Sequence, residues 1–261
     1  MIPRVLASTT SHKGEPLLPT LEIFARLDLG DIDLNLHHVL EAGVSVDAIR
    51  RIAGEHGLRL WAASGGWCDF FHDPPRIEET FRSVDRQVEI AGALDVSLLR
   101  LFFGRLKDED YTPARRDTIV ANLRGLAERH PGIGFVFENH DGASLNPEVC
   151  RDVLERVDRP NIRMNFDPIN FERAGVDSRH ALARLQPFIG HAHLKGLEAG
   201  EYCEFGVGDV DLAPVIRALV RGGYTGSFSV EYEGPHDKTL RLYQSVQRAR
   251  ALLDELARDP T

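Results

Sequence analysis

Four side chains that can bind a metal ion each lie at the end of a short apolar run in the second half of the chain. They are Glu138, Asp167, His193 and Glu231, in the runs IGFVFENH (133–140), IRMNFDP (162–168), IGHAHLKG (189–196) and SFSVEYEG (227–234). Short apolar runs of this kind are typical of buried parallel strands. In a parallel barrel the carboxyl ends of the strands meet on one face, where active sites are built. We therefore expect the four side chains to lie close together.

Three carboxylates and one imidazole in one place favour a bound cation, because like charges at close range destabilise one another. An oxygen-rich set with one nitrogen and no thiolate suits a hard divalent ion. We predict one divalent metal ion, with Mn²⁺ in first place and Mg²⁺, Co²⁺ or Zn²⁺ as alternatives. The alternative for the two glutamates is a structural ion pair, and for Asp167, which precedes Pro168, a turn aspartate.

The elements that would position these ligands alternate between strand-like and helical segments along the whole chain. Strand-like runs are expected at residues 4–8, 32–36, 58–63, 97–103, 133–138, 162–167, 189–195 and 227–231. Helical stretches are expected at residues 17–27, 45–56, 76–94, 113–130, 147–157, 178–185, 212–222 and 237–258. Eight such alternations predict an α/β fold, a (β/α)8 barrel made by a single domain, residues 1–261. An open doubly wound sheet is the alternative, and it is disfavoured because no GxGxxG follows the first strand.

Charge, apolar runs and cysteines argue against several classes of protein. The formal net charge of −9 over 261 residues disfavours nucleic acid as a partner. No apolar run approaches the roughly 20 residues of a membrane span, and the opening MIPRVLASTTSHKG lacks the pattern of a signal peptide. Three distant cysteines without a CxxC motif favour free thiols in a reducing compartment. We expect a cytoplasmic protein without nucleic-acid or membrane partners.

The second half of the chain resembles the sugar phosphate isomerase/epimerase family, part of the xylose isomerase-like TIM-barrel superfamily. The residues that carry the resemblance are FENHDG, NFDPIN, HAHLKG and FGVGDVDLAPVIRALVRGGYTGSFSVEYEG, in this order. The resemblance implies a divalent ion held by Glu138, Asp167, His193 and Glu231. It also implies a small sugar or cyclitol substrate, and it leaves the oligomeric state, a homo-oligomer included, open.

Three positions depart from patterns found within this superfamily. The ketose 3-epimerases carry a second Glu where this chain has Ser144 and an Arg where it has Ala199, which argues against a free-ketose 3-epimerase. Many members carry a His where this chain has Asn170. The apurinic endonucleases of the superfamily need extra histidines for a three-metal site, so Asn170 and the acidic net charge argue against that activity.

Residues near the expected strand ends are candidates for contact with the substrate. The predicted substrate-binding residues are His140, His191, Lys195, Asn170, His37 and Trp67. His191 shares the strand face of His193 because side chains alternate along a strand, and a buried structural histidine is its alternative. A solvated surface lysine is the alternative for Lys195, and loop residues without a role are the alternative for His37 and Trp67.

The first functional hypothesis is an isomerase or epimerase that moves a proton next to a carbonyl, with Glu138 and Glu231 as the catalytic acid and base. A lyase or dehydratase that begins with the same proton removal is the alternative. A barrel without catalytic activity, acting as a binding subunit, is a third hypothesis, and the intact set of four ligands argues against it. No Gly-x-Ser-x-Gly motif appears, so nucleophilic catalysis has little support.

We predict that the purified protein does not nick abasic DNA in the presence of Mg²⁺ or Mn²⁺. The acidic net charge of −9 disfavours approach to phosphate, and Asn170 replaces a histidine. Gel analysis of an abasic duplex would check this, with an apurinic endonuclease as the positive control. Metal-dependent cleavage at a comparable rate would overturn the sugar hypothesis.

Overall fold

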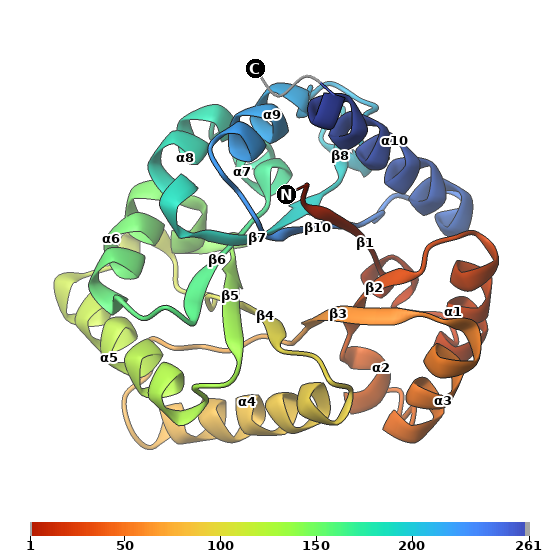
Figure 1. The fold of residues 1–261 in the computed structure, drawn as a ribbon. Helices are drawn as coiled ribbons and strands as arrows, with labels where there is room; N and C mark the ends of the chain where they lie inside the picture. The colour runs from red at the N-terminus through yellow and green to blue at the C-terminus, as the bar shows by residue number, and fades with distance from the viewer. Residues whose placement is uncertain (1, 259–261) are drawn as a thin grey trace.

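Eight parallel strands form a closed barrel in the computed structural model, which describes residues 2–258 (Figure 1). The strand order around the barrel is β1-β10-β7-β6-β5-β4-β3-β2. The barrel strands are β1 (Arg4–Ser8), β2 (Asp31–Asn35), β3 (Arg59–Ser64), β4 (Leu98–Phe102), β5 (Gly134–Glu138), β6 (Ile162–Phe166), β7 (Ile189–Leu194) and β10 (Ser227–Val230). The predicted barrel is confirmed, and each strand begins and ends within one residue of the expected range. Residues 1 and 259–261 of the predicted domain lie outside the described part.

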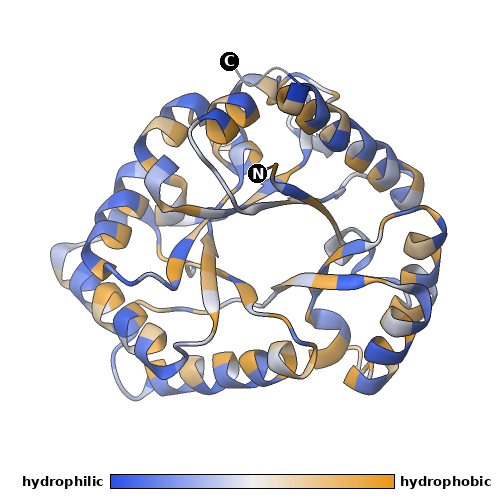
Figure 2. Cartoon of the chain, in the orientation of Figure 1, coloured by the Kyte–Doolittle hydropathy of each residue, from blue (hydrophilic) through white to orange (hydrophobic). Residues whose placement is uncertain are grey.

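The helices surround the barrel and bury their apolar side against it (Figure 1). The longer ones are α1 (Leu17–Arg26), α3 (Val46–His56), α4 (Arg76–Ala93), α5 (Pro113–Arg129), α6 (Pro147–Val157), α8 (Ser178–Leu185), α9 (Ala213–Arg221) and α10 (Lys238–Arg258). Local signals set their ends: the Ser45 hydroxyl accepts a hydrogen bond from the Ala48 backbone N–H at 3.1 Å, and Gly57 ends the same helix with φ 66°. In Figure 2 the helices carry hydrophobic and hydrophilic residues along their length, as two-sided helices do.

Several short elements were not predicted. They are the helices α2 (His37–Leu40) and α7 (Pro168–Arg173), the 3₁₀ turns η1 (Thr9–His12), η2 (Asp108–Asp110), η3 (Gly142–Leu145) and η4 (Gln186–Phe188), and an antiparallel hairpin of β8 (Gly196–Glu198) and β9 (Glu201–Cys203). Short elements of this size lie below the length at which a hydrophobic period is detectable. Most of them follow a barrel strand directly, so they surround the face on which the predicted ligands lie.

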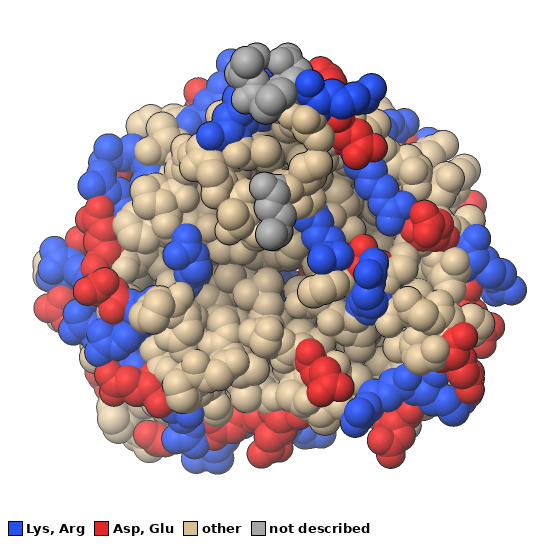
Figure 3. Space-filling view, viewed as in Figure 1, with Lys and Arg blue, Asp and Glu red and all other residues tan. Residues whose placement is uncertain are grey.

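The apolar core and the charged surface are clearly separated. Phe24, Phe70, Phe135, Phe166 and Phe228 are among the largest fully buried side chains. Figure 3 shows acidic and basic side chains mixed around the rim, with mostly uncharged residues toward the centre of the face shown. The three cysteines are buried free thiols. Among residues 2–258, no helix combines the length and the apolar character needed to cross a bilayer.

We predict that Gly208→Ala destabilises the fold by about 1–3 kcal/mol. Gly208 has φ 95°, and a Cβ placed on it would lie 2.2 Å from the Leu197 carbonyl oxygen at the base of the β8–β9 hairpin. Urea unfolding followed by circular dichroism would measure the loss. Gly14→Ala is the matched control, because nothing lies within 4 Å of a Cβ at that position. Equal stability of the two variants would contradict the role of Gly208.

Candidate metal centre

The strand ends bring the four predicted ligands together around His193. Glu138 is the last residue of β5, Asp167 and Glu231 directly follow β6 and β10, and His193 lies near the end of β7. The Nδ1 atom of His193 is 3.3 Å from Glu231 Oε2 and 3.7 Å from Glu138 Oε1. Glu138, Asp167 and His193 each offer a ligand atom within 4.8 Å of the other two. All four side chains are between 0% and 3% exposed, so their charges are removed from bulk water.

Asp167 has a second role, as the N-cap of α7. Its Oδ1 accepts hydrogen bonds from the backbone N–H groups of Ile169 and Asn170 at 2.9 and 3.0 Å. Pro168 ends the strand and supplies the first helical residue, where its missing N–H costs nothing. The other oxygen, Oδ2, lies 3.0 Å from the Lys195 ammonium. A turn residue and a metal ligand were alternative roles for Asp167. The geometry allows both, because Oδ1 caps the helix and Oδ2 remains available to a metal ion.

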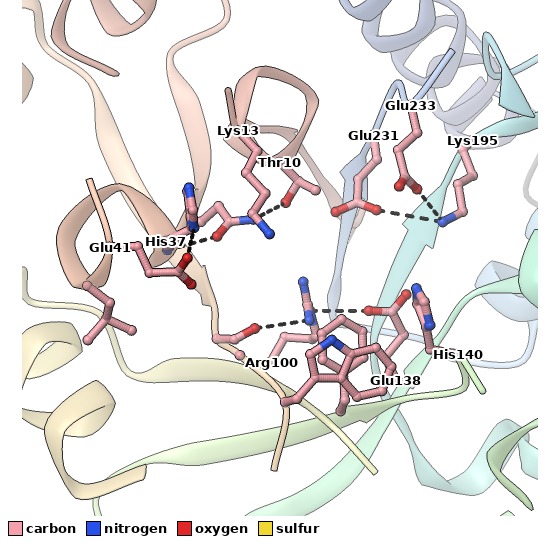
Figure 4. A pocket seen from close by; sticks show the side chains of 16 residues that line it. Thr10, Lys13, His37, Glu41, Arg100, Glu138, His140, Lys195, Glu231 and Glu233 are labelled. Atoms are coloured by element: carbon pink, nitrogen blue, oxygen red, sulfur yellow. Dashed lines mark hydrogen bonds and ion pairs between the residues drawn. The ribbon is translucent and has the colours of Figure 1, made fainter. Parts of the chain in front are cut away.

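Two buried cations neutralise part of the carboxylate charge (Figure 4). Arg100 Nε lies 3.2 Å from Glu138 Oε2, in a pair that is 4% and 2% exposed. Lys195 Nζ lies 2.7 Å from Glu233 Oε1, and 3.9 Å from Glu231 Oε2. Four carboxylates, counting Asp167, surround these two permanent cations, which compensate only part of their charge. A proton on Asp167 or His193, or a divalent ion in place of these protons, would balance the rest.

The pKa values follow the competition between burial and neighbouring charges. Burial alone would raise the pKa of Glu138, but Arg100 and His193 outweigh it and hold the pKa below its usual value. Burial would lower the pKa of His193, but Glu231 and Glu138 raise it well above 6.5. Burial likewise opposes the charged form of Lys195, yet Asp167 and Glu233 raise its pKa. Burial is also outweighed at Glu231, where His193 lowers the pKa, whereas burial raises the pKa of Asp167. Glu138 and Glu231 are thus ionised, and Lys195 is charged, at neutral pH.

A second polar layer lies deeper in the barrel, below His193. Asp33, His191 and His193 also offer ligand atoms within 4.8 Å of one another. The two ring nitrogens of His191 are hydrogen-bonded to Ser229 at 2.8 Å and Ser227 at 2.9 Å. Burial, and then the neighbouring His193, lower the pKa of His191 well below 6.5, so the ring is neutral. His191 supports the ring beside it, with the centroids 5.5 Å apart.

A cavity of about 310 Å³ opens above Glu138 and Glu231. One wall is a stack of alternating rings and guanidinium groups. Trp67 and Phe102 lie parallel with centroids 4.1 Å apart; the Arg105 guanidinium lies 4.1 Å from the Trp67 centroid and that of Arg100 lies 4.3 Å from the Phe102 centroid. Trp67 and Phe102 cover each other's facing sides. At these distances Arg105 must therefore lie on the outer face of Trp67, and Arg100 on the outer face of Phe102. The stack therefore connects the surface to the buried Arg100, and His140 packs edge-on against both rings.

The predicted substrate-binding residues divide into two groups. His140, Lys195, His37 and Trp67 line the cavity, although both faces of the Trp67 ring are covered by the stack and only an edge is available to a ligand. His37 lies in α2 and pairs with Glu41 at 3.0 Å. Asn170 and His191 do not line the cavity, because Asn170 lies behind Glu138 and His191 lies below His193. Their predicted contact with substrate therefore does not match their position, and both instead support predicted ligands.

Three residues of the site were not predicted. Arg100 is a charged residue inside the apolar strand β4 (LLRLF), where the pattern that identified Glu138 was present as well, whereas Asp33 lies among other polar residues in β2 (DIDLN). A charged residue in a buried strand almost always has a partner. Tyr202, which lies in the β8–β9 hairpin, has its ring 4.6 Å from Lys195 Nζ. No local pattern in the sequence marks a hairpin of this size as part of a site.

The comparison with protein families agrees with this architecture. The model of the family described as "Xylose isomerase-like TIM barrel" matches residues 21–257. The chain belongs to this family.

Known members of the xylose isomerase-like family similar to this chain include both dehydratases and isomerases. The 3-dehydroshikimate dehydratase of Bacillus anthracis is 23% identical over 129 residues, which is 48% of this chain and 46% of that protein. The 2-oxo-tetronate isomerase of Pectobacterium atrosepticum is 25% identical over 175 residues, 64% of this chain and 65% of that protein. These matches span about half and about two thirds of the relatives' own lengths.

A solved structure shows the same fold over nearly the whole chain. The xylose isomerase-like TIM-barrel protein of Mycobacterium smegmatis in complex with magnesium superposes with a TM-score of 0.75 at 19% identity. The superposition covers 97% of each chain. At this identity the similarity establishes the fold.

The residues of the site fit a divalent ion. Neither ring nitrogen of the buried His193 has a hydrogen-bond partner among the described residues, so one of them is available to a metal ion. Nδ1 faces the glutamates, whereas Nε2 lies 3.8 Å from Asp33 Oδ2, a carboxylate of the kind that commonly supports a ligating imidazole. The surrounding donors are carboxylate oxygens, which such ions prefer.

We predict that Lys195→Met lowers the free energy of unfolding in EDTA by about 3–5 kcal/mol, because removing one member of a buried ion pair leaves Asp167 and Glu233 uncompensated. Mn²⁺ should restore more stability to this variant than it adds to the wild-type protein. Chemical denaturation with and without Mn²⁺ would measure both effects. Lys238→Met is the control: its pair with Glu15 is 39% and 44% exposed and should contribute little. Wild-type stability of Lys195→Met in EDTA would show that the carboxylates do not depend on this cation.

Proposed function

We propose that this chain is a divalent-metal-dependent isomerase or epimerase that removes a proton next to a carbonyl of a sugar, keto-sugar or keto-inositol. The observation that carries the proposal is the position of Glu138 and Glu231. Both line the 310 Å³ cavity, and both lie within 3.7 Å of His193 Nδ1. Two carboxylates that face one small cavity can serve as acid and base to the same substrate.

The proposed ion would be held by Glu138, Asp167, His193 and Glu231. When bound, it would act as a Lewis acid that polarises the substrate carbonyl and makes the adjacent proton more acidic. Mn²⁺ is the first candidate because the set combines oxygen ligands with one imidazole. The magnesium complex of the structurally similar Mycobacterium smegmatis protein supports a hard divalent ion as well.

The two glutamates differ in how firmly they are held, which supports different roles for them. Both oxygens of Glu138 have partners: Oε2 forms an ion pair with Arg100 Nε at 3.2 Å, and Oε1 accepts a hydrogen bond from Asn170 Nδ2 at 3.1 Å. The Oε1 atom of Glu231 accepts from Ser8 at 3.3 Å, and its Oε2 faces His193 and, more distantly, Lys195. Glu231 is therefore freer to take a proton from a substrate, whereas Glu138 is the more strongly anchored carboxylate. We assign proton removal to Glu231 and proton return, together with orientation, to Glu138.

The remaining cavity residues would bind and orient the substrate. Lys195 and His140 present nitrogen atoms at the cavity wall, and Nδ1 of His140 lacks a hydrogen-bond partner among the described residues. His37 and Trp67 lie farther along the same wall. The cavity is large enough to hold a single sugar-sized molecule.

A lyase or dehydratase is the second candidate, and the similarity to the Bacillus anthracis dehydratase favours it. The same proton would be removed first. A hydroxyl on the next carbon would then accept a proton and leave as water, so the product would differ from the substrate by one water molecule. An isomerase or epimerase product has the same composition as its substrate, so mass spectrometry of the product separates the two candidates.

We predict that turnover in D₂O places deuterium on the carbon next to the carbonyl, because the proton held by Glu231 exchanges with solvent. A panel of keto-sugars, keto-inositols and 3-dehydroshikimate, each with Mn²⁺, would be followed by NMR and mass spectrometry. An EDTA-treated sample is the control and should show neither turnover nor exchange. Turnover with full retention of the substrate hydrogen would contradict proton transfer through a carboxylate.

Replacing either glutamate by glutamine should lower kcat by about 10²–10⁴-fold, because the amide keeps the shape but cannot accept the proton. The larger loss is expected for Glu231→Gln, the less anchored of the two. Glu55→Gln, which alters an exposed pair with Arg51 on α3, is the control and should be silent. If both active-site variants keep wild-type turnover with metal bound, the assignment of the acid and base is wrong.

A further inference from the structure

A directed series of hydrogen bonds runs from the protein surface to Glu138. Arg173 Nη1 donates to the Tyr202 hydroxyl at 3.0 Å, and this hydroxyl donates to Asn170 Oδ1 at 3.2 Å. Asn170 Nδ2 then donates to Glu138 Oε1 at 3.1 Å. Arg173 lies at the end of α7 and Tyr202 in the β8–β9 hairpin. The other two members, Asn170 and Glu138, are buried and only 4% and 3% exposed. The series therefore links two elements outside the barrel to a proposed metal ligand.

The direction of each bond is determined by the chemistry of its members. A guanidinium can only donate, so the Tyr202 hydroxyl accepts from Arg173 and its single hydrogen is left for Asn170. The Asn170 oxygen must therefore face Tyr202, and its NH₂ group must face the other way. That group donates to Glu138 Oε1 and to the Asn139 carbonyl at 2.9 Å, and both of these groups can only accept. A flipped amide would place its oxygen against two acceptors and lose the bonds to Glu138 and to the Asn139 carbonyl.

The oxygen that accepts from the Asn170 amide, Glu138 Oε1, is the one that faces the proposed metal site. Glu138 Oε1 is the atom 3.7 Å from His193 Nδ1, whereas Oε2 is taken by Arg100. Without the amide, the remaining strong partner of Glu138 would be Arg100, which pulls the carboxylate to the other side. The hairpin follows Lys195 directly, and the ring of Tyr202 also lies 4.6 Å from Lys195 Nζ.

We propose that Tyr202 is a positioning residue that orients the Asn170 amide, fixes the Glu138 oxygen facing His193 and so sets the affinity of the site for a divalent ion. This inference rests on the proposed metal centre. Partners of metal ligands typically contribute 10–100-fold to metal affinity. Tyr202 contacts Asn170 and not Glu138 itself, so its effect on metal affinity is expected near the lower end of this range.

The test is a titration of Mn²⁺ into metal-free protein, with free Mn²⁺ followed by electron paramagnetic resonance, so that no substrate or activity is required. Tyr202→Phe keeps the ring over Lys195 and removes only the hydroxyl, and it should raise the Kd about tenfold. Asn170→Ala should raise the Kd by about 10–100-fold. The double variant should bind no more weakly than Asn170→Ala, because Tyr202 acts only through Asn170. Asn170→His should recover most of the affinity, since an imidazole offers one donor and one acceptor.

The matched control is Tyr111→Phe, which removes a hydroxyl bonded to Asp152 at 3.3 Å outside the cavity and should leave the Kd unchanged. A wild-type Kd for Tyr202→Phe, or additive losses in the double variant, would overturn the positioning role while leaving the metal centre intact. A wild-type protein that binds no Mn²⁺ would instead refute the proposed metal centre, and the positioning role with it. Thermal unfolding in EDTA gives a second measurement. If Tyr202 only stabilises the fold, Tyr202→Phe should unfold at a lower temperature and keep the wild-type Kd for Mn²⁺.

Discussion

The burial of several like charges at the end of the barrel is the constraint on which the rest of the site depends. An isolated carboxylate in the protein interior is strongly unfavourable unless it is paired and hydrogen-bonded. Glu138 is met by Arg100, Asp167 by Lys195 and the first turn of α7, and Glu231 by Ser8. These partners come from strands far apart in the chain, so the charges can be compensated only once the barrel has closed.

The same compensation gives similar groups different properties. Glu138 has an ion pair on one oxygen and a hydrogen bond on the other, whereas Glu231 has one long hydrogen bond and the His193 ring. Two carboxylates in one cavity acquire separate roles when their surroundings differ in this way. The two oxygens of Asp167 have different roles: Oδ1 caps α7, and Oδ2 faces the site. The cap and the Lys195 ammonium together keep the second oxygen in place.

Support for the site extends outward in two directions from Glu138. On one side, Arg100 is covered by Phe102 and Trp67, with Arg105 as the outermost layer. On the other, Asn170 leads to Tyr202 on the hairpin. The outer members of the two supports, Trp67, Arg105 and Tyr202, lie outside the barrel strands, in loops and in the hairpin at the carboxyl ends of the strands. Variation in these segments can therefore alter the site without altering the fold.

The sequence by itself determined the barrel and the four polar residues that meet at one end of it. Each apolar strand and each two-sided helix carries its own periodic pattern, and strand polarity alone puts the residues that end the strands on one face. Glu138, Asp167, His193 and Glu231 could be selected because each is a polar exception in such a run. Only the tertiary structure decided which cation faces which carboxylate, that Asn170 and His191 lie against Glu138 and His193 and not at the cavity wall, and that the Tyr202 hydroxyl reaches Asn170. Those contacts join residues up to 38 positions apart, such as Lys195 and Glu233, or Arg100 and Glu138 across neighbouring strands. They depend on distances of a few ångströms between side chains, which no periodic pattern in a single chain encodes.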